Sequence, residues 1–243
     1  MFKRIISYLK YYWAKTNSER YCQFLQNKGV KVGVGTHINA KTCLIDITRP
    51  SLVTIGDNCY INDHFTLLTH DWVTNVFLHA GKEFINSSGR VTIGNNVSFG
   101  RNVTVLKGVS IGDNCFIGAG SIVTKDIPSN VIAVGSPCKV VMTLEEYYQK
   151  RLHKCEAEAL EYARSIQERF GRKPEPKDFW EEFRFFVSGY EVDLYPEIPI
   201  KKQLGPDYER YVKNHKAKYS SFNDFLRSAM CVGGGRINVF RFA

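Results

Sequence analysis

The sequence lacks several features that would assign it to a common class. It has no apolar run approaching the roughly 20 residues that cross a bilayer, and its N-terminus lacks the apolar core and cleavage site of a signal peptide. Its seven scattered cysteines include no C-x-x-C pair, which predicts reduced thiols without a disulfide framework or a zinc site. We therefore expect a cytoplasmic protein with no metal.

Positive charge is concentrated at the N-terminus. The net charge is +9, and residues 1–31 carry seven Lys or Arg against one acid, Glu19. The rest of the chain is nearly charge-balanced and has no Lys/Arg-rich run, which argues against nucleic-acid binding. A helix in residues 1–31 would suit an anionic membrane surface, or its apolar stripe would cover one end of the next domain. That stripe consists of Phe2, Ile5, Ile6, Leu9 and Trp13.

A six-residue repeat organises the middle of the chain. The period recurs in an opening block at Val32, Ile38 and Leu44, and again at Ile55, Ile61 and Leu67. Neither an α-helix nor a plain strand has a period of six, but a short strand followed by a corner does. Three such units close a triangular coil with the leading apolar side chains inside. The longest unbroken run of leading residues is Ile93, Phe99, Val105, Ile111, Ile117 and Val123.

The repeat and its closing segment resemble a known family. The stretch "IGDNCFIGAGSIVTKDIPSNVIAVGSPCKVV", residues 111–141, is similar to the final coils of the hexapeptide-repeat acyltransferases, and the resemblance covers roughly residues 20–142. It implies an all-β, left-handed parallel β-helix over residues 32–142. The handedness comes from the family, since it opposes the usual right-handed crossover. An N-terminal basic amphipathic segment, 1–31, would precede this domain.

Residues 143–243 are expected to form a mainly α-helical C-terminal extension. Thr143 and Glu146 form a capping-box pattern, and an amphipathic helix then runs to Gly171. Two shorter helices are predicted in "KPEPKDFWEEFRFF" and "SSFNDFLRSA". We expect their aromatic residues to pack against the β-helix or a neighbouring subunit.

The stretch "TLLTHDWVTNVF", residues 66–77, begins inside the repeat and then breaks it. Residues 72–90 contain no hexad, which predicts a loop ejected from the coil, and such loops usually carry function. In the resembled family a loop leaves the β-helix at this point, and the histidine just before it is the catalytic base; His70 stands in that place. Imidazole, with an ordinary pKa of ~6.5, can remove the proton of a sugar hydroxyl that attacks a thioester.

Five more residues are candidates for contact with the acceptor. Asn62 and Asp63 lie one hexad before the break, Asp46 lies about one coil earlier, and His79 lies in the ejected loop. Asp71 would occupy a slot that is small or apolar elsewhere, where a buried unpaired carboxylate is costly. Either the repeat ends before it, or its carboxylate is paired and helps to fix an imidazole.

The resemblance also implies a donor site. The Ala119 backbone would contact the pantetheine arm of coenzyme A, with Thr124 and Lys125 beside it. Lys139 matches the family's basic residue near the nucleotide phosphates, where a cation is electrostatically reasonable. Arg101 falls where related enzymes have a smaller polar residue, and either reaches a phosphate of the donor or lies on the outer face. Because the family builds its active site between neighbouring subunits, a homotrimer is implied.

These residues predict an acetyl-CoA-dependent O-acetyltransferase. The acetyl group would pass to a sugar hydroxyl of a surface polysaccharide or its precursor by direct attack, with His70 as general base. A lipid-linked glycan acceptor would suit the basic N-terminal helix, with peripheral contact at the inner membrane surface. The nearest alternative is an N-acetyltransferase of a nucleotide-linked amino sugar, or an antibiotic acetyltransferase. A zinc enzyme of the carbonic-anhydrase kind lacks its H-x4-H spacing here, and a non-catalytic scaffold would leave His70 unused.

Overall fold

The structure is a computed structural model that describes residues 2–231, without the side chains of residues 2–5 and 7. Residues 232–243, which end the predicted C-terminal extension, and the side chains of Phe2 and Ile5 in the predicted apolar stripe lie outside the described residues. The chain divides into two compact units, one of residues 1–149 and one that begins at residue 150. Each is described by itself.

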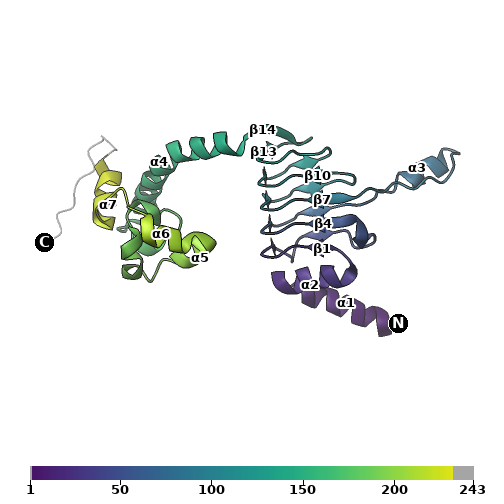
Figure 1. Cartoon of the computed structure of the whole chain (residues 1–243), viewed down its shortest axis with the longest axis horizontal. Helices are drawn as coiled ribbons and strands as arrows, with labels where there is room; N and C mark the ends of the chain where they lie inside the picture. Colours follow the sequence, from purple (N-terminus) through teal and green to yellow (C-terminus); the bar gives the residue numbers. More distant parts are fainter. Residues whose placement is uncertain (1, 232–243) are drawn as a thin grey trace. The chain divides into compact units, whose positions relative to one another are not determined.

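A coil of short parallel strands forms the centre of the first unit (Figure 1). Each strand from β1 to β9 pairs in parallel with the strand three places further along the chain, which gives three sheets. The first sheet contains β1 (Lys31–Val32), β4 (Val53–Ile55), β7 (Val91–Ile93) and β10 (Ser110–Ile111). The second contains β2 (His37–Ile38), β5 (Tyr60–Ile61), β8 (Ser98–Phe99), β11 (Phe116–Ile117), β13 (Val131–Val134) and the antiparallel β14 (Lys139–Thr143). The third contains β3 (Leu44–Ile45), β6 (Thr66–Leu67), β9 (Thr104–Val105) and β12 (Ile122–Val123).

The corners of the coil are numbered by the sheets that they join. The first corner leads from the first sheet to the second, the second corner from the second sheet to the third, and the third corner from the third sheet back to the first. The leading residues point inward, as the six-residue period predicts. Those from Ile93 to Val123 are at most 2% exposed, and Ile55, Ile61 and Leu67 at most 1%. Each such side chain contributes about 1.5–3 kcal/mol relative to an exposed position.

The opening coil departs from the predicted phase at one position. Leu44 is 49% exposed, whereas Ile45 is 4% exposed and pairs with Leu67. The step from Ile38 to the next inward residue is therefore seven positions rather than six. The prediction of Leu44 as a leading residue was wrong by one position. A short 3-10 turn, η1 (Pro50–Leu52), fills the corner before β4.

Glycine and asparagine occupy the corners for different reasons. Gly94 does not have a positive φ, but a Cβ there would lie 2.8 Å from the backbone carbon of Gly112 in the next coil. Close approach of successive coils therefore requires this glycine. The left-handed conformation at the first corner belongs to Asn96, Asn114 and Asn130, with φ of 54°, 56° and 62°. Their side-chain amides form a ladder, with N···O distances of 2.9 Å at both steps.

Two helices, α1 (Phe2–Ala14) and α2 (Ser18–Lys28), precede the coil. The side chain of Asn17 caps α2 by accepting a hydrogen bond from the third following backbone N–H, at 3.3 Å. α2 contacts β1 and β2, and its Tyr21 and Leu25 are fully buried in the same core as the leading residues. α2 therefore covers the open end of the first coil.

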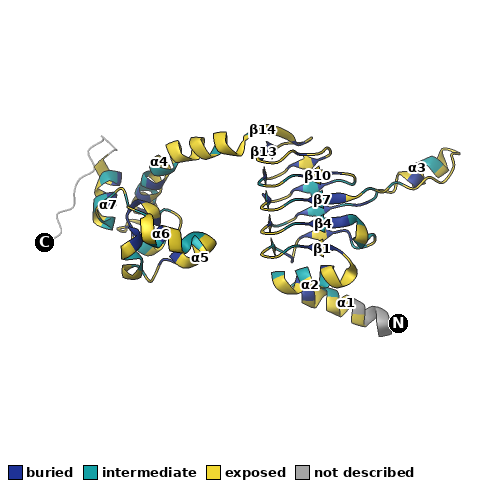
Figure 2. Ribbon diagram, viewed as in Figure 1, coloured by how far each residue is buried: buried dark blue, intermediate teal, exposed yellow. Residues whose placement is uncertain are grey.

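The apolar stripe of α1 does not have this role. Ile6, Leu9 and Trp13 are 38%, 63% and 61% exposed, and α1 is largely exposed in Figure 2. The prediction that the stripe covers the end of the domain was wrong, because Tyr21 and Leu25 of α2 already fill that position.

The loop of residues 72–90, which contains α3 (Val73–His79), projects from the third corner between β6 and β7 (Figure 1). Its two arms pair at the base, where His70 bridges Ser88 and Gly89 N donates to the carbonyl of Thr69 at 2.9 Å. Above the loop, β7 pairs directly with β4. The loop is thus inserted without disturbing the stack.

The second unit continues from α4 (Leu144–Phe170), which begins in the first unit. Glu146 N donates to Thr143 Oγ1 at 3.1 Å, and Thr143 N donates to the Glu146 carboxylate at 2.7 Å, so the predicted capping box is present. The helix ends before Gly171, which has a φ of 62°.

The remainder differs from the prediction in two respects. The expected second helix is replaced by 3-10 turns, and α5 and α6 were not predicted. Phe179, Phe183 and Phe186 pack in a core of their own with α4 and α7, so the expectation that they contact the β-helix was wrong. The elements are η2 (Pro176–Asp178), η3 (Phe183–Phe185), η4 (Gly189–Leu194), α5 (Ile200–Leu204), η5 (Gly205–Asp207), α6 (Tyr208–Asn214) and α7 (Phe222–Cys231).

Candidate active site

His70 lies at the third corner, where the loop leaves the coil. Its side chain is 17% exposed, and its Nδ1 lies 2.7 Å from Oδ2 of Asp46. Asp46 follows Ile45 at the same corner one coil earlier, beneath the strand that carries Leu67. With the Nδ1–H donated to this carboxylate, the lone pair of the neutral ring resides on Nε2. Nε2 is then the atom that can accept a proton.

Asp46 is buried and accepts hydrogen bonds through both oxygens. Oδ1 accepts from Thr48 N and Oγ1 at 2.9 and 2.6 Å, and Oδ2 accepts from Thr69 N at 3.1 Å and from the Thr69 hydroxyl. Burial of the carboxyl raises its pKa, but the hydrogen bonds from Thr48, Thr69 and His70 outweigh burial and hold the pKa of Asp46 well below its usual value. The sequence suggested Asp46 as an acceptor contact, whereas the structure directs it at His70.

Asp71 faces away from this pair. Its side chain is 45% exposed, so the repeat ends before it, and the carboxylate beside the imidazole is that of Asp46. The Lys107 ammonium, one coil above, donates hydrogen bonds to Asp71 and to Ser87. The bond from Lys107 is the main cause that lowers the pKa of Asp71, aided by the backbone N–H of Val73. This clasp joins both arms of the loop to the coil.

Periodicity could not identify Lys107. It follows Val105 at the third corner, but a long flexible side chain has no direction that sequence spacing predicts. The same is true of Thr69, which is fully buried beside Asp46. Only the pairing of β3 with β6 places Thr69 against that carboxylate.

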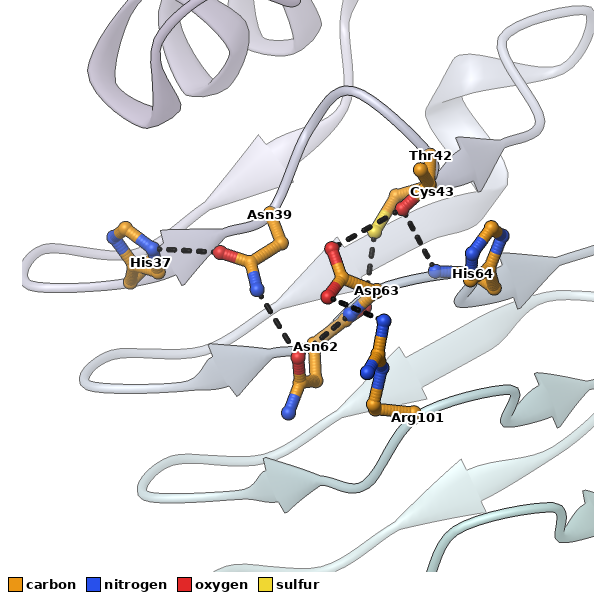
Figure 3. Close-up of polar contacts among 8 residues, drawn as sticks. All are labelled: His37, Asn39, Thr42, Cys43, Asn62, Asp63, His64 and Arg101. Carbon is orange, nitrogen blue, oxygen red and sulfur yellow. Dashed lines mark hydrogen bonds and ion pairs between the residues drawn. The ribbon is translucent and has the colours of Figure 1, made fainter. Parts of the chain in front are cut away.

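A second polar group occupies the second corner (Figure 3). Asp63 Oδ2 lies 3.2 Å from Arg101 Nη2, and Asp63 Oδ1 accepts from Thr42 Oγ1 at 3.3 Å. Asn62 Oδ1 accepts from Asn39 Nδ2 at 3.0 Å and from Asp63 N at 2.8 Å. The structure thus joins Arg101, predicted to face the donor, to a residue predicted to face the acceptor.

The other predicted residues are distributed over the first unit. Ala119 is exposed at the second corner, directly above Gly100. Thr124 and Lys125 are exposed at the third corner, and Lys139 begins β14. His79, at the end of α3, is exposed.

The two corners are separate edges of one chain's coil. β6 connects them, with Asn62 and Asp63 before it and His70 after it. The structure therefore brings Asp46 to His70, but it places Asn62, Asp63 and Arg101 at a different edge.

A groove of about 570 Å³ opens beside His70. It falls within the size range of small-molecule sites. Within residues 2–231, no three His, Cys, Asp or Glu residues lie close enough together to hold a metal ion. The same residues contain no helix with the length and apolar character needed to cross a membrane. The groove is lined by Tyr8, Tyr11, Phe24, Lys28, Leu44, Ile45, Asp46, Ile47, Thr48, Leu68 and His70.

Residues 90–125 match the family model described as bacterial transferase hexapeptide (six repeats). Over 131 residues the chain is 40% identical to galactoside O-acetyltransferase of Escherichia coli strain K12. The matched region covers 52% of this chain and 62% of that protein. The chain therefore spans about three fifths of the length of this relative.

Two solved structures are also similar. Maltose O-acetyltransferase from Clostridium difficile 630 is 34% identical, over 47% of this chain and 58% of that one, with a TM-score of 0.39. Galactoside acetyltransferase in complex with coenzyme A is 36% identical, over 52% of this chain and 70% of that one, with a TM-score of 0.37. The chain belongs to the hexapeptide-repeat acyltransferase family. Within it, the sequence is similar to sugar O-acetyltransferases.

Proposed function

We propose that the chain is an acetyl-CoA-dependent O-acetyltransferase that acts on a sugar hydroxyl of a surface polysaccharide or its precursor. The observation that supports this most is the contact of 2.7 Å between His70 Nδ1 and Asp46 Oδ2 at the base of the ejected loop. It orients the imidazole so that Nε2 is available as a base, backed by an ionised carboxylate. The 40% identity to a galactoside O-acetyltransferase supports the sugar acceptor.

In the proposed reaction, His70 Nε2 takes the proton of the acceptor hydroxyl while its oxygen bonds to the thioester carbonyl carbon. The carbon–sulfur bond then breaks, and the imidazolium returns the proton to the departing thiolate. Asp46 lies close enough to stabilise the transient positive charge of the ring. No acyl-enzyme is needed, because binding donor and acceptor side by side can supply most of the rate enhancement.

The proposed donor site consists of Ala119, Thr124, Lys125 and Lys139, as the family resemblance implies. Arg101 is included because its side chain is 63% exposed and can meet a phosphate beyond Asp63. We also propose that the coil is left-handed, as the family resemblance implies. Since the second and third corners are separate edges of one chain, we propose further that the chain forms a homotrimer. In such a trimer, the second corner of one subunit faces the third corner of its neighbour.

On the acceptor side, the proposal assigns Asn62, Asp63 and His79 to contacts with the saccharide, and gives Asp71 a supporting role. Asp71 would act through the loop that it helps to fix, given its bond to Lys107. The exposed apolar residues of α1, together with the basic charge of residues 1–31, support peripheral contact with the inner membrane surface.

The test is thiol release from acetyl-CoA with a panel of sugars and nucleotide sugars, for the wild type and His70→Ala. We expect acceptor-dependent release that falls about 10²- to 10⁴-fold in His70→Ala. His153→Ala, at an exposed histidine of α4, is the matched control and should be unchanged. If thiol release with an amino sugar as acceptor persists in His70→Ala, N-acetylation is favoured. If the wild-type chain does not bind coenzyme A, the transferase proposal is rejected.

A further inference from the structure

The groove beside His70 has walls from three successive layers of the first unit. Helices α1 and α2 contribute Tyr8 and Phe24, the first coil contributes Leu44 and Ile47, and the second coil contributes Leu68 just before His70. The groove therefore runs from the N-terminal helices across the first coil to the candidate catalytic base.

Most of these walls are apolar, and two of them are open to solvent. Tyr8 is 63% exposed and Leu44 is 49% exposed. Leu44 faces outward because of the seven-residue step in the opening coil, which turns Ile45 inward in its place. The irregularity that displaces the repeat thus also places a leucine side chain in the groove.

The exposed surface of the groove is mainly apolar, although Tyr8 and Tyr11 carry hydroxyl groups, which bond to Tyr12 and Lys15. Asp46, Thr48 and His70 form one polar cluster, in which both threonine and histidine bond to the carboxylate. Among the described residues that line the groove, Lys28 is the one Lys or Arg, and its Nζ lies 5.5 Å from the centre of the Phe24 ring. A free sugar is polar on all sides and would find few hydrogen-bond partners along this floor, whereas an apolar chain loses nothing by lying there.

The groove leads to a surface of the same character. On α1, Leu9, Tyr12 and Trp13 are 63%, 52% and 61% exposed, and residues 1–31, with seven Lys or Arg against one acid, carry most of the net positive charge of the chain. We propose that the groove binds the hydrocarbon chain of a lipid-linked acceptor, whose sugar hydroxyl is thereby placed at His70. This inference rests on the proposed function and narrows its substrate class from saccharides to amphiphilic glycans.

The test uses n-alkyl β-D-galactosides and glucosides from butyl to octyl, below their micellar concentrations, with binding to the full chain measured by calorimetry. In the wild type we expect the Kd to fall by up to about fourfold for each added methylene, equivalent to ~0.8 kcal/mol. In Leu44→Asn, the change in log Kd for each added methylene should be at most half of that in the wild type. Leu152→Asn, at an exposed leucine of α4 that does not line the groove, should leave it unchanged.

Each other outcome has a definite meaning. No binding of the octyl glycosides, a Kd that does not depend on chain length, or an unchanged dependence in Leu44→Asn would overturn the inference. If Leu44→Asn instead shifts the oligomeric state in sedimentation while the wild type shows no chain-length dependence, the groove is an interface between copies and the inference is again overturned. Chain-length-dependent binding without thiol release from acetyl-CoA would support the groove while rejecting the proposed transferase activity.

Discussion

The regular coils of residues 91–127 and the irregular coils of residues 31–71 use the same six-residue unit for different purposes. In the regular coils every leading residue is buried and every pairing step is the same length. In the irregular coils one step has seven residues, the next corner contains a 3-10 turn, and a long loop follows. The buried Asp46 and Thr69 both lie in the irregular part.

This difference shows how a repetitive fold can hold a buried polar pair, to which the proposed function assigns the chemistry. A coil that obeys the repeat has only apolar or small side chains inside, so it offers stability and no chemistry. Asp46 is tolerated inside because Thr48, Thr69 and His70 satisfy its oxygens, and these partners exist only where the repeat is broken. Four predictions probe this contrast, in order of decreasing effect.

The largest effect is expected for Ile117→Ala in the regular coils. Removing this fully buried side chain should lower the free energy of unfolding by about 2–5 kcal/mol, because the coils above and below cannot collapse into the cavity. Ile122→Ala, at an isoleucine that is 37% exposed, is the control and should cost much less. Urea denaturation measures both, and equal losses would contradict an ordered interior stack. The kcat of Ile117→Ala should remain near that of the wild type.

Asp46→Asn, in contrast to Ile117→Ala, should act mainly on kcat. An amide keeps the size of the side chain but removes the charge that stabilises the His70 imidazolium, so we expect kcat to fall roughly 10- to 100-fold. Asp113→Asn is the matched control, since Asp113 is an exposed corner carboxylate that accepts from Asn95 N at 2.6 Å. Steady-state kinetics distinguish them, and equal kcat values for the two variants would reject the role of Asp46.

The acid sensitivity of the fold should also depend on Asp46. Because the folded pKa of Asp46 is lowered, its stabilisation is fully present above the unfolded pKa of ~3.9 and is lost as the pH falls toward the folded value. Between pH 7 and pH 3, the melting temperature of Asp46→Asn should therefore decrease less than that of the wild type. Thermal unfolding across this window measures the difference, and parallel curves would contradict a lowered pKa.

The smallest effect is expected for Lys107→Gln. It removes the ammonium that holds Asp71 and Ser87, but the pair is partly exposed and screened by solvent. KM for the acceptor should change by no more than about fivefold, with kcat preserved. The change should decrease further at high salt. A kcat loss as large as that of Asp46→Asn would mean that the clasp, rather than the buried pair, controls the chemistry.

Much of the architecture was predictable because periodicity reports which face of a strand is buried. The leading residues Ile93 to Val123, the break after His70 and the start of α4 all follow from spacing and capping patterns. The phase of the opening coil did not, because a single inserted residue between Ile38 and Ile45 leaves both Leu44 and Ile45 as plausible inward residues. Only the pairing with Leu67 decides between them.

The pairing of Asp46 with His70 depends on that same phase. With Leu44 inward, Asp46 has no reason to point at the next coil, so the sequence offered it only as an acceptor contact. The aromatic residues of the second unit show a similar limit. Composition indicates that Phe179 and Phe186 are buried, but it does not indicate which surface buries them.

The end of the stack has a further consequence. A parallel coil has no intrinsic length, since its last strands present the same unpaired edge as every strand before them. Here β14 turns back antiparallel on β13, with an irregularity between Ile132 and Ala133, and α2 covers the opposite end. Because these two caps occupy edges at which further strands could add, they oppose end-to-end joining of molecules into a fibril.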